Sequence, residues 1–401
     1  MSNHEAAAPD WLNSQYIEEM LKEFYKDDTV LVSKFLVLPG SSIGDNYASQ
    51  IFRINVECLT KNKKRSLSII AKVMPNTDLS NEINKNLDIF KIEKLMLTET
   101  LPLMYEKLLQ HNEKERFFPF LYKMDTDNKM IFMEDLKAEG YQMMDRKTPL
   151  DLEHTLLAIK SFAKMHAAGY LLLKNDPFYK DKYLDHFWKK NNESSISEKI
   201  TEGSLSYLVK SLNFWPISED DKKIFRNFQG NLYEKMVDSY SRKETSFNVI
   251  LHGDCWLNNM MFKYENEKLI AVKLIDYQLS NYNAIGLDLN YFIFTSSKNE
   301  VKLQYLEKVF QTYYETFTGI TGEIKNLTID RIRKEFIERL AFGFVCAAIF
   351  RGGILAPKPF DLDAYVEGKD SPSNVEMYQN EIFIQEIVEL LPLFKKYGIF
   401  K

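Results

Sequence analysis

Two short apolar runs, each followed by polar residues, constrain the fold of this chain more than any other feature. The run at residues 249–251 leads into a loop that carries Asp254 and, five places later, Asn259. A second run, residues 269–275, ends at Asp276. Short apolar runs bounded by turn residues are typical of buried strands. The pattern therefore predicts a strand, a loop and a pair of strands that bring two aspartates and an asparagine to adjoining strand ends.

These three side chains have the spacing that phosphoryl transfer requires. The reaction needs a carboxylate beside the attacking hydroxyl and oxygen ligands for Mg²⁺. We expect Asp254 to orient and deprotonate the acceptor, and Asn259 and Asp276 to bind Mg²⁺. The catalytic loop of protein kinases carries its aspartate and asparagine at the same offset. His252 is grouped with the catalytic residues, in the role of ordering the loop rather than reacting. The alternative is a buried turn with a hydrogen-bonded aspartate and an incidental asparagine.

The loop also carries a family resemblance. The stretch His252–Phe262, HGDCWLNNMMF, resembles the HGDxWxNNxMF signature of the ecdysteroid kinase-like family, or CHK kinase-like group. The stretch Asp276–Gln278 is similar to the D-Y/F-Q motif of that family. The family is related to the aminoglycoside and choline kinases, which share the protein-kinase architecture. The resemblance implies an α+β, two-lobed protein-kinase-like fold with a small antiparallel-sheet N-lobe and a large, mainly helical C-lobe.

Lys72 and Glu93 are a candidate pair for nucleotide binding. Lys72 lies inside the apolar strand predicted at residues 67–74, and Glu93 lies within the apolar stripe of the following predicted helix. A buried carboxylate needs a cation, and Lys72 is the nearest in sequence. Kinases use such a pair to orient the lysine onto nucleotide phosphates. A lysine on an edge strand and a glutamate on a partly wet helix edge are the alternatives. Residues 90–93 also resemble the F-x-x-E helix motif of the family.

The turn at residues 39–49 is a candidate phosphate loop. It is rich in Gly, Ser and Asn, and backbone N–H groups in such turns can bind phosphate. An ordinary hairpin turn is the alternative. The sequence GDNYAS within it resembles the phosphate loop of the family. This resemblance implies nucleotide contacts for Gly44, Asp45, Asn46 and Ser49.

The end of the first lobe is predicted from a buried strand at residues 130–133. A short extended connector with Glu134 and Leu136 follows it. Backbone groups of a connector between lobes can bind an adenine edge, whereas a simple strand exit is the alternative. The connector resembles the hinge of the family, which implies nucleotide contacts at Glu134 and Leu136. We therefore expect an N-lobe at residues 1–136 and a C-lobe at residues 137–401.

Most of the second lobe lacks a readable motif. A helix is predicted to start at Thr148, with Pro149 next and Asp151 three places on, and to stop at Gly169, with His166 in a packing role. Residues 171–248 are rich in aromatic side chains, most of which we expect between helices and some in the acceptor pocket. The sequence does not indicate which.

Asp288 follows Asp276 after only eleven intervening residues. That interval is too short for the activation segment of a protein kinase, and its A-P-E motif is absent, which disfavours peptide substrates. Asp288 resembles a second acidic position of the family, which caps a helix and supports the catalytic loop. A capping role and a catalytic role both remain open.

Composition excludes several other classes. The chain is 45% hydrophobic and has a net charge of −5, which suits sizeable cores and disfavours a nucleic-acid groove. Three distant cysteines predict neither a disulfide framework nor a zinc site. The N-terminus lacks a signal pattern, and no apolar run approaches the length of a membrane span. We expect a soluble, cytoplasmic monomer without nucleic-acid or membrane partners.

Together these features predict an enzyme that transfers the γ-phosphoryl group of ATP, with Mg²⁺, to a hydroxyl of a small-molecule acceptor. The resemblance implies an ecdysteroid or another apolar hydroxylated acceptor, in hormone inactivation or detoxification. The alternatives are a choline- or aminoglycoside-type kinase with a polar cationic acceptor, a protein kinase, and a nucleotide-binding pseudokinase. A pseudokinase is expected to lack Lys72, Asp254 or Asp276, and all three are present.

Overall fold

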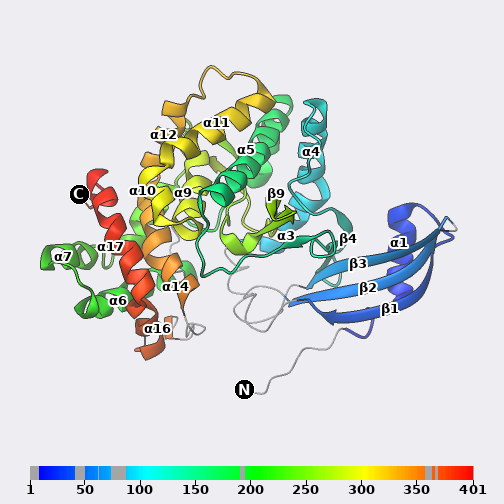
Figure 1. Ribbon diagram of the computed structural model, residues 1–401, viewed down its shortest axis with the longest axis horizontal. Coiled ribbons are helices and arrows are strands. Elements are labelled where there is room, and N and C mark those ends of the chain that lie inside the picture. Colours follow the sequence, from blue (N-terminus) through cyan, green and yellow to red (C-terminus); the bar gives the residue numbers. More distant parts are fainter. Residues whose placement is uncertain are drawn as a thin grey trace.

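A small antiparallel sheet lies at one side of a larger, mainly helical body (Figure 1). This arrangement confirms the predicted fold class. The computed structural model describes residues 9–40, 50–61, 63–73, 87–189, 195–356, 364–365 and 369–400. The predicted phosphate-loop residues, Gly44, Asp45, Asn46 and Ser49, lie outside the described residues.

The sheet has five strands in the order β1-β2-β3-β5-β4, and all neighbouring strands are antiparallel. The strands are β1 (Leu31–Pro39), β2 (Gln50–Thr60), β3 (Lys63–Val73), β4 (Leu121–Asp125) and β5 (Met130–Glu134). Buried residues alternate along β2, as expected when one face of a sheet is covered. They pack with helix α1 (Ser14–Tyr25), which begins where the Asn13 side chain accepts a hydrogen bond from the Tyr16 N–H.

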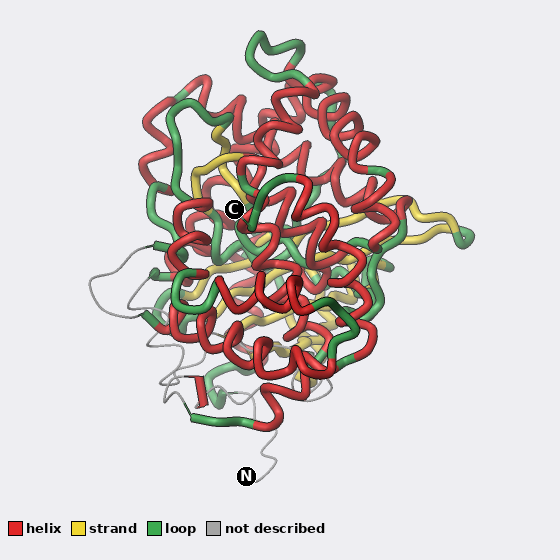
Figure 2. Tube along the Cα trace, turned by 90° about the vertical axis from the view of Figure 1, so that its left-hand side faces the viewer, coloured by secondary structure: helices red, strands yellow, loops and turns green. Residues whose placement is uncertain are grey.

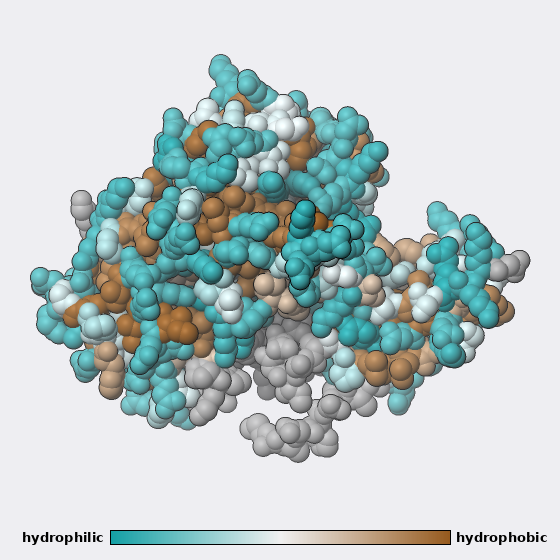
Figure 3. All heavy atoms as spheres, in the orientation of Figure 1, coloured by the Kyte–Doolittle hydropathy of each residue, from teal (hydrophilic) through white to brown (hydrophobic). Residues whose placement is uncertain are grey.

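Helices form most of the rest of the molecule, and Figure 2, which is viewed from the helical side, shows them in front of most of the strands. They are α3 (Ile89–Leu95), η1 (Met96–Thr100), α4 (Leu101–Gln110), α5 (Leu152–Asn175), η2 (Pro177–Tyr183), α6 (Ile196–Ser211), η3 (Leu212–Phe214), α7 (Glu219–Asn227), α8 (Leu232–Tyr240), η4 (Leu257–Asn259), α9 (Ile285–Ser296), α10 (Asn299–Gln304), α11 (Leu306–Thr321), α12 (Ile329–Glu338), α13 (Leu340–Val345), η5 (Cys346–Phe350), α14 (Arg351–Leu355), α16 (Pro372–Glu376), η6 (Met377–Gln379) and α17 (Glu381–Lys396). The space-filling view shows a largely hydrophilic surface with hydrophobic patches (Figure 3).

Helix α5 packs between α11 and α4 (Figure 1). The predicted start at Thr148 is wrong by three residues, because the capping side chain is that of Asp151, which accepts a hydrogen bond from the His154 N–H. The predicted stop at Gly169 is wrong, because α5 continues to Asn175. Buried residues on both sides of Gly169 hold the helix in the core, and this packing outweighs the weak helix propensity of glycine. Among the described residues, α5 alone is long and apolar enough to cross a membrane, and 67% of that apolar window is buried inside the protein.

Two small sheets carry the predicted strand ends. One pairs β7 (Asn248–Leu251) with β10 (Asn281–Ala284), and the other has the order β6-β8-β9. Its strands are β6 (Tyr141–Gln142), β8 (Met260–Glu265) and β9 (Lys268–Leu274). Met260 pairs with Leu274, so the strand that follows Asn259 and the strand that precedes Asp276 are antiparallel neighbours, as predicted. Asn266 and Glu267 both have positive φ, the conformation of a tight two-residue hairpin turn.

The buried apolar side chains form two clusters. The smaller cluster joins the five-stranded sheet to α1, and the larger one fills the helical body. Residues 87–118, which precede the predicted lobe boundary, contribute their buried side chains to the larger cluster. The two clusters do not divide the chain at Leu136, so the lobe boundary at that residue stays a prediction.

Close contact between α9 and α12 makes Gly286 a sensitive position. A Cβ added there would lie 2.1 Å from the Glu335 carbonyl oxygen. We expect Gly286→Ala to lower the free energy of unfolding by about 1–3 kcal/mol, because the helices must move apart. Gly319→Ala is the matched control, since its added Cβ meets no described atom within 4 Å, and a gain of up to about 1 kcal/mol is expected there. Urea unfolding followed by circular dichroism measures both, and equal midpoints for the two variants would contradict the prediction.

Candidate active site

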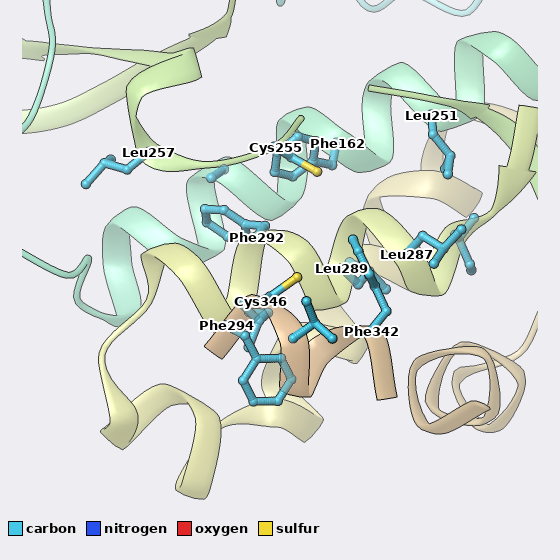
Figure 4. Close-up of a cluster of buried hydrophobic side chains, with 14 of the residues drawn as sticks. Phe162, Leu251, Cys255, Leu257, Leu287, Leu289, Phe292, Phe294, Phe342 and Cys346 are labelled. Carbon is cyan, nitrogen blue, oxygen red and sulfur yellow. The ribbon is translucent and has the colours of Figure 1, made fainter. Parts of the chain in front are cut away.

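The loop after β7 is held by a glycine and by a buried carboxylate. Gly253 has a φ of 83°, and a Cβ there would lie 2.1 Å from the Leu279 carbonyl oxygen, so only glycine fits. Asp288, on α9, accepts hydrogen bonds from the His252 N–H at 2.8 Å and the Gly253 N–H at 3.0 Å. Figure 4 shows the apolar part of the same region, where Cys255 of the loop lies beside Phe162 of α5; Leu257 belongs to the same buried cluster.

Asp288 is therefore a support of the loop in this structure. It is buried, and a further hydrogen bond joins it to His166 Nε2 at 3.1 Å, while Tyr313 holds the other ring nitrogen of His166 at 2.9 Å. Helix α9 has no side-chain cap, so Asp288 does not make the capping bond considered from the sequence. Burial opposes the charged form, but the hydrogen bond and charge of His166 outweigh it and hold the pKa of Asp288 below its ordinary value.

Asp254 is oriented by two donors. Its Oδ1 accepts a hydrogen bond from the Tyr291 hydroxyl at 2.7 Å, and its Oδ2 accepts one from Asn259 Nδ2 at 2.9 Å. Burial, with a second contribution from the charge of Asp276, raises the pKa of Asp254 to about 6. The sequence reasoning missed Tyr291. It lies three residues after Asp288, a spacing that places both side chains on one face of α9, and this spacing was the available signal.

His252 connects the loop to the end of β9. Its Nδ1 accepts a hydrogen bond from the Asp254 N–H at 3.3 Å, which leaves Nε2 to donate to the Ile275 carbonyl at 3.1 Å. Burial lowers the pKa of His252, so the ring is neutral in this position. A second tie runs from the Ile275 N–H to the Asn259 carbonyl at 3.0 Å. These bonds bring the loop and the segment with Asp276 together.

Lys72, Glu93 and Asp276 meet as one buried cluster. Lys72 Nζ lies 2.8 Å from both Glu93 carboxylate oxygens and 2.8 Å from Asp276 Oδ1. Burial alone would lower the pKa of Lys72, but the charges of Asp276 and Glu93 outweigh it and raise the pKa. The predicted Lys72–Glu93 pair is confirmed, and the structure adds Asp276 to it. Asp276 has a φ of 66°, which turns the chain sharply after β9.

Two oxygen donors suit a cation between the loop and Asp276. Both side-chain hydrogen bonds of Asn259 use Nδ2, so within the described residues its Oδ1 makes no bond. The Asp276 side chain is 25% exposed, compared with 5% for Lys72 and 1% for Glu93. In the part of the chain that the structure describes, no three His, Cys, Asp or Glu side chains gather as metal ligands. Mg²⁺ at Asn259 and Asp276 would therefore need further oxygens, which nucleotide phosphates supply.

The predicted hinge residues, Glu134 and Leu136, make ion pairs and backbone hydrogen bonds within the protein. The Glu134 carboxylate pairs with Arg116 at 2.8 Å and with Lys273 of β9 at 3.1 Å, so it links the five-stranded sheet to the hairpin that carries Asp276. The Glu134 N–H donates to the Phe120 carbonyl, and the Leu136 carbonyl accepts from the Tyr141 N–H. Because these two backbone groups already have partners, a bound adenine would have to contact other backbone groups of this segment.

One family model matches most of the chain. The ecdysteroid kinase-like family matches residues 43–325. No curated protein matches the sequence. Among solved structures, the chain is similar to an ethanolamine kinase of Plasmodium vivax, with 14% identity, coverage of 96% of this chain and 91% of that chain, and a TM-score of 0.42. It is also similar to the GDP and kanamycin complex of an aminoglycoside phosphotransferase, with 11% identity, coverage of 96% and 100%, and a TM-score of 0.36.

Removal of the Asp288 carboxylate tests its role as a support. Asp288→Ala leaves two buried backbone N–H groups without acceptors, and we expect the free energy of unfolding to fall by about 3 kcal/mol or more. Because the pKa of Asp288 is lowered, this difference is present at neutral pH and shrinks only below the ordinary carboxylate pKa of about 4. Urea unfolding at several pH values measures it.

The matched control is Asp238→Ala on α8, where the aspartate is exposed. That change is expected to alter the free energy of unfolding by less than about 0.5 kcal/mol. Equal losses at the two positions would show that Asp288 does not support the loop.

Proposed function

Because this chain belongs to the ecdysteroid kinase-like family, whose members are small-molecule phosphotransferases, we propose that it transfers the γ-phosphoryl group of ATP, with Mg²⁺, to a hydroxyl of a small molecule. One observation carries this proposal. Lys72 Nζ lies 2.8 Å from Glu93 and from Asp276. The adjoining loop carries Asp254, whose carboxylate accepts hydrogen bonds from Asn259 of the loop and from Tyr291 of α9. Charge for phosphate binding and a carboxylate for proton removal are thus gathered from four separate segments of the chain.

Each residue has a definite part in the proposed reaction. Asp254 accepts the proton of the acceptor hydroxyl as the hydroxyl oxygen forms a bond to the γ-phosphorus and the bond to the ADP oxygen breaks. A carboxylate with a pKa near 6 is mostly charged at neutral pH and is a stronger base than an ordinary aspartate. Lys72, held by Glu93, binds phosphate. Asn259 and Asp276 would hold Mg²⁺, which neutralises charge on the transferred group.

The proposed acceptor is an ecdysteroid or another apolar hydroxylated compound, in hormone inactivation or detoxification. The family match supports this choice over a cationic acceptor. The glycine-rich turn with Gly44, Asp45, Asn46 and Ser49 belongs to the proposal as the cover of the phosphates, on the basis of its sequence alone.

An acceptor screen tests the function. Purified protein with ATP and Mg²⁺ is incubated with an ecdysteroid, choline and kanamycin, and mass spectrometry detects the gain of one phosphate. Asp254→Asn is expected to lower turnover by about 100-fold to 10,000-fold, because the amide cannot accept the proton, while calorimetry shows ATP binding retained. Absence of transfer by the wild-type protein to any alcohol, or near-normal turnover by the variant, would overturn the proposal.

The pH dependence of the reaction reports on Asp254. We expect kcat/KM to rise with pH through about 6, because the carboxylate must be charged to accept a proton. Tyr291→Phe removes a hydrogen bond that stabilises the charged form, so the rise should move to higher pH. Tyr264→Phe is the control, since its hydroxyl bonds His154 instead. A rise at the same pH in both variants would show that Tyr291 does not set the pKa of Asp254.

A further inference from the structure

Arg339, between α12 and α13, is buried without a full set of partners. It is 0% exposed, and the only hydrogen bond of its side chain among the described residues runs from Nη2 to the Ser246 Oγ at 3.0 Å. Its Nε and Nη1 atoms are buried and have no hydrogen-bond partner. Buried donors without acceptors are rare in proteins, so we expect a further hydrogen-bond acceptor beside this guanidinium.

The charge of Arg339 also lacks a counter-ion. Glu335, one helical turn earlier, is buried, but its carboxylate is paired with Arg331 at 2.7 Å. Glu338 is exposed and lies 3.7 Å from Lys334. Each of these carboxylates thus serves another cation, and Arg339 makes no ion pair in the described part of the chain. Burial lowers the pKa of Arg339, and the charges of Glu335 and Glu338 only partly offset this effect.

Ser246 belongs to the segment between α8 and β7, which has the charge pattern of a protein-kinase substrate. Lys243 and Thr245 are exposed, and Ser246 is partly exposed. Arg242 and Lys243 precede Ser246 by four and three places. Protein kinases select substrates in part by charge, and basic residues before the modified residue suit an acidic substrate groove. A second arginine, Arg331, donates to the Thr245 carbonyl.

We propose that Ser246 is a phosphorylation site and that Arg339 binds the phosphate. In the modification, the Ser246 hydroxyl oxygen forms a bond to the γ-phosphorus of ATP held by a separate protein kinase, and the bond to the ADP oxygen breaks. The hydroxyl proton passes to the base of that kinase. Nη2 of a guanidinium shares one donor edge with Nε and another with Nη1, so a phosphate on Ser246 can bind Arg339 through two nitrogens. The negative charge of the phosphate supplies the missing counter-ion.

A buried water molecule is the rival partner of Arg339. Glu335 Oε2 also lacks a hydrogen-bond partner, so one water could accept from Arg339 and donate to Glu335. Water supplies no negative charge, however, and would leave the buried guanidinium without a counter-ion.

The phosphate would act on the segment that leads to the catalytic loop. The Phe247 N–H donates to Glu335 at 2.8 Å, and the Phe247 carbonyl accepts from the Ile285 N–H of α9 at 3.2 Å. Strand β7 begins at the next residue, Asn248. Binding of the phosphate by Arg339 adds a further link between this segment and the helices, and we expect it to stabilise the folded protein.

Incorporation of phosphoserine during translation tests the binding by Arg339. Ser246→phosphoserine is expected to raise the midpoint of thermal unfolding of the full chain by about 2 °C or more, because new charge-assisted hydrogen bonds form. Phosphorus NMR should show a lower second pKa of the phosphate in the folded protein than in the same protein unfolded in urea, since the arginine favours the dianion. Arg339→Lys keeps the charge but lacks the planar fork, so it should remove at least half of both effects.

Thr245→phosphoserine is the matched control, because Thr245 is exposed and its hydroxyl makes no hydrogen bond among the described residues. It should leave the midpoint unchanged. Equal rises for phosphoserine at residues 245 and 246 would show a general attraction of phosphate to this basic segment, and would overturn the assignment to Arg339. A fall in the midpoint for Ser246→phosphoserine would overturn it as well, and would leave water as the partner of the guanidinium.

A second experiment tests the modification itself. The full chain is incubated with ATP, Mg²⁺ and each of several protein kinases that select basic residues before serine, and mass spectrometry locates the phosphate. We expect phosphate on Ser246, loss of it in Ser246→Ala, and a rate at least tenfold lower in Lys243→Glu. Incubation without a protein kinase is the control. Phosphate at other residues only, or none, would show that Ser246 is not a phosphorylation site. None of these readouts depends on transfer to a small-molecule acceptor, so the inference stands or falls apart from the proposed function.

Discussion

A lysine ammonium buried between two carboxylates is the constraint on which the arrangement of the site depends. An unpaired charge inside a protein is costly, so Lys72 can lie where it does only if partners reach it. Glu93 comes from α3 and Asp276 from the segment after β9, while Lys72 itself lies on β3. The same pairing therefore joins the five-stranded sheet to the segment after β9, and it fixes the position of the lysine ammonium.

A second buried carboxylate gives the catalytic loop its shape. Asp288 satisfies two consecutive backbone N–H groups of the loop, and His166 and Tyr313 in turn hold it in position. Asp254, immediately after these groups, has both carboxylate oxygens already hydrogen-bonded. Groups that are fixed in advance need little rearrangement during a reaction, which is the main physical source of catalytic advantage in sites of this kind.

The candidate phosphate and metal ligands come from other parts of the chain than most of the apolar cavity beside Tyr291. The candidate ligands lie on β3, on α3 and at the ends of the two hairpin strands, whereas the cavity is lined by Trp256 and Tyr291 and by side chains of α6, η5, α14 and η6. Tyr291 belongs to both, because its ring lines the cavity and its hydroxyl orients Asp254. Side chains of the cavity can therefore differ in size or charge without altering the Lys72 cluster.

Local sequence was sufficient for the elements that carry the chemistry. The apolar runs before Asp254 and Asp276 predicted strands, which the structure contains, and the need of a buried glutamate for a cation predicted the contact between Lys72 and Glu93. The phosphotransfer role of the loop stays a prediction. Periodicity failed at Gly169, where core packing carried α5 past a residue that commonly ends helices.

Only the tertiary structure decided the contacts between distant segments. It joined Asp276 to Lys72, assigned Asp288 to the loop backbone instead of its own helix end, set Tyr291 against Asp254, and enclosed an apolar cavity beside Arg146. The physical reason is the separation of the contacting residues along the chain. Strand periods, turns and spacing are read from neighbours in the chain, whereas these contacts depend on how helices far apart in sequence pack around a shared core.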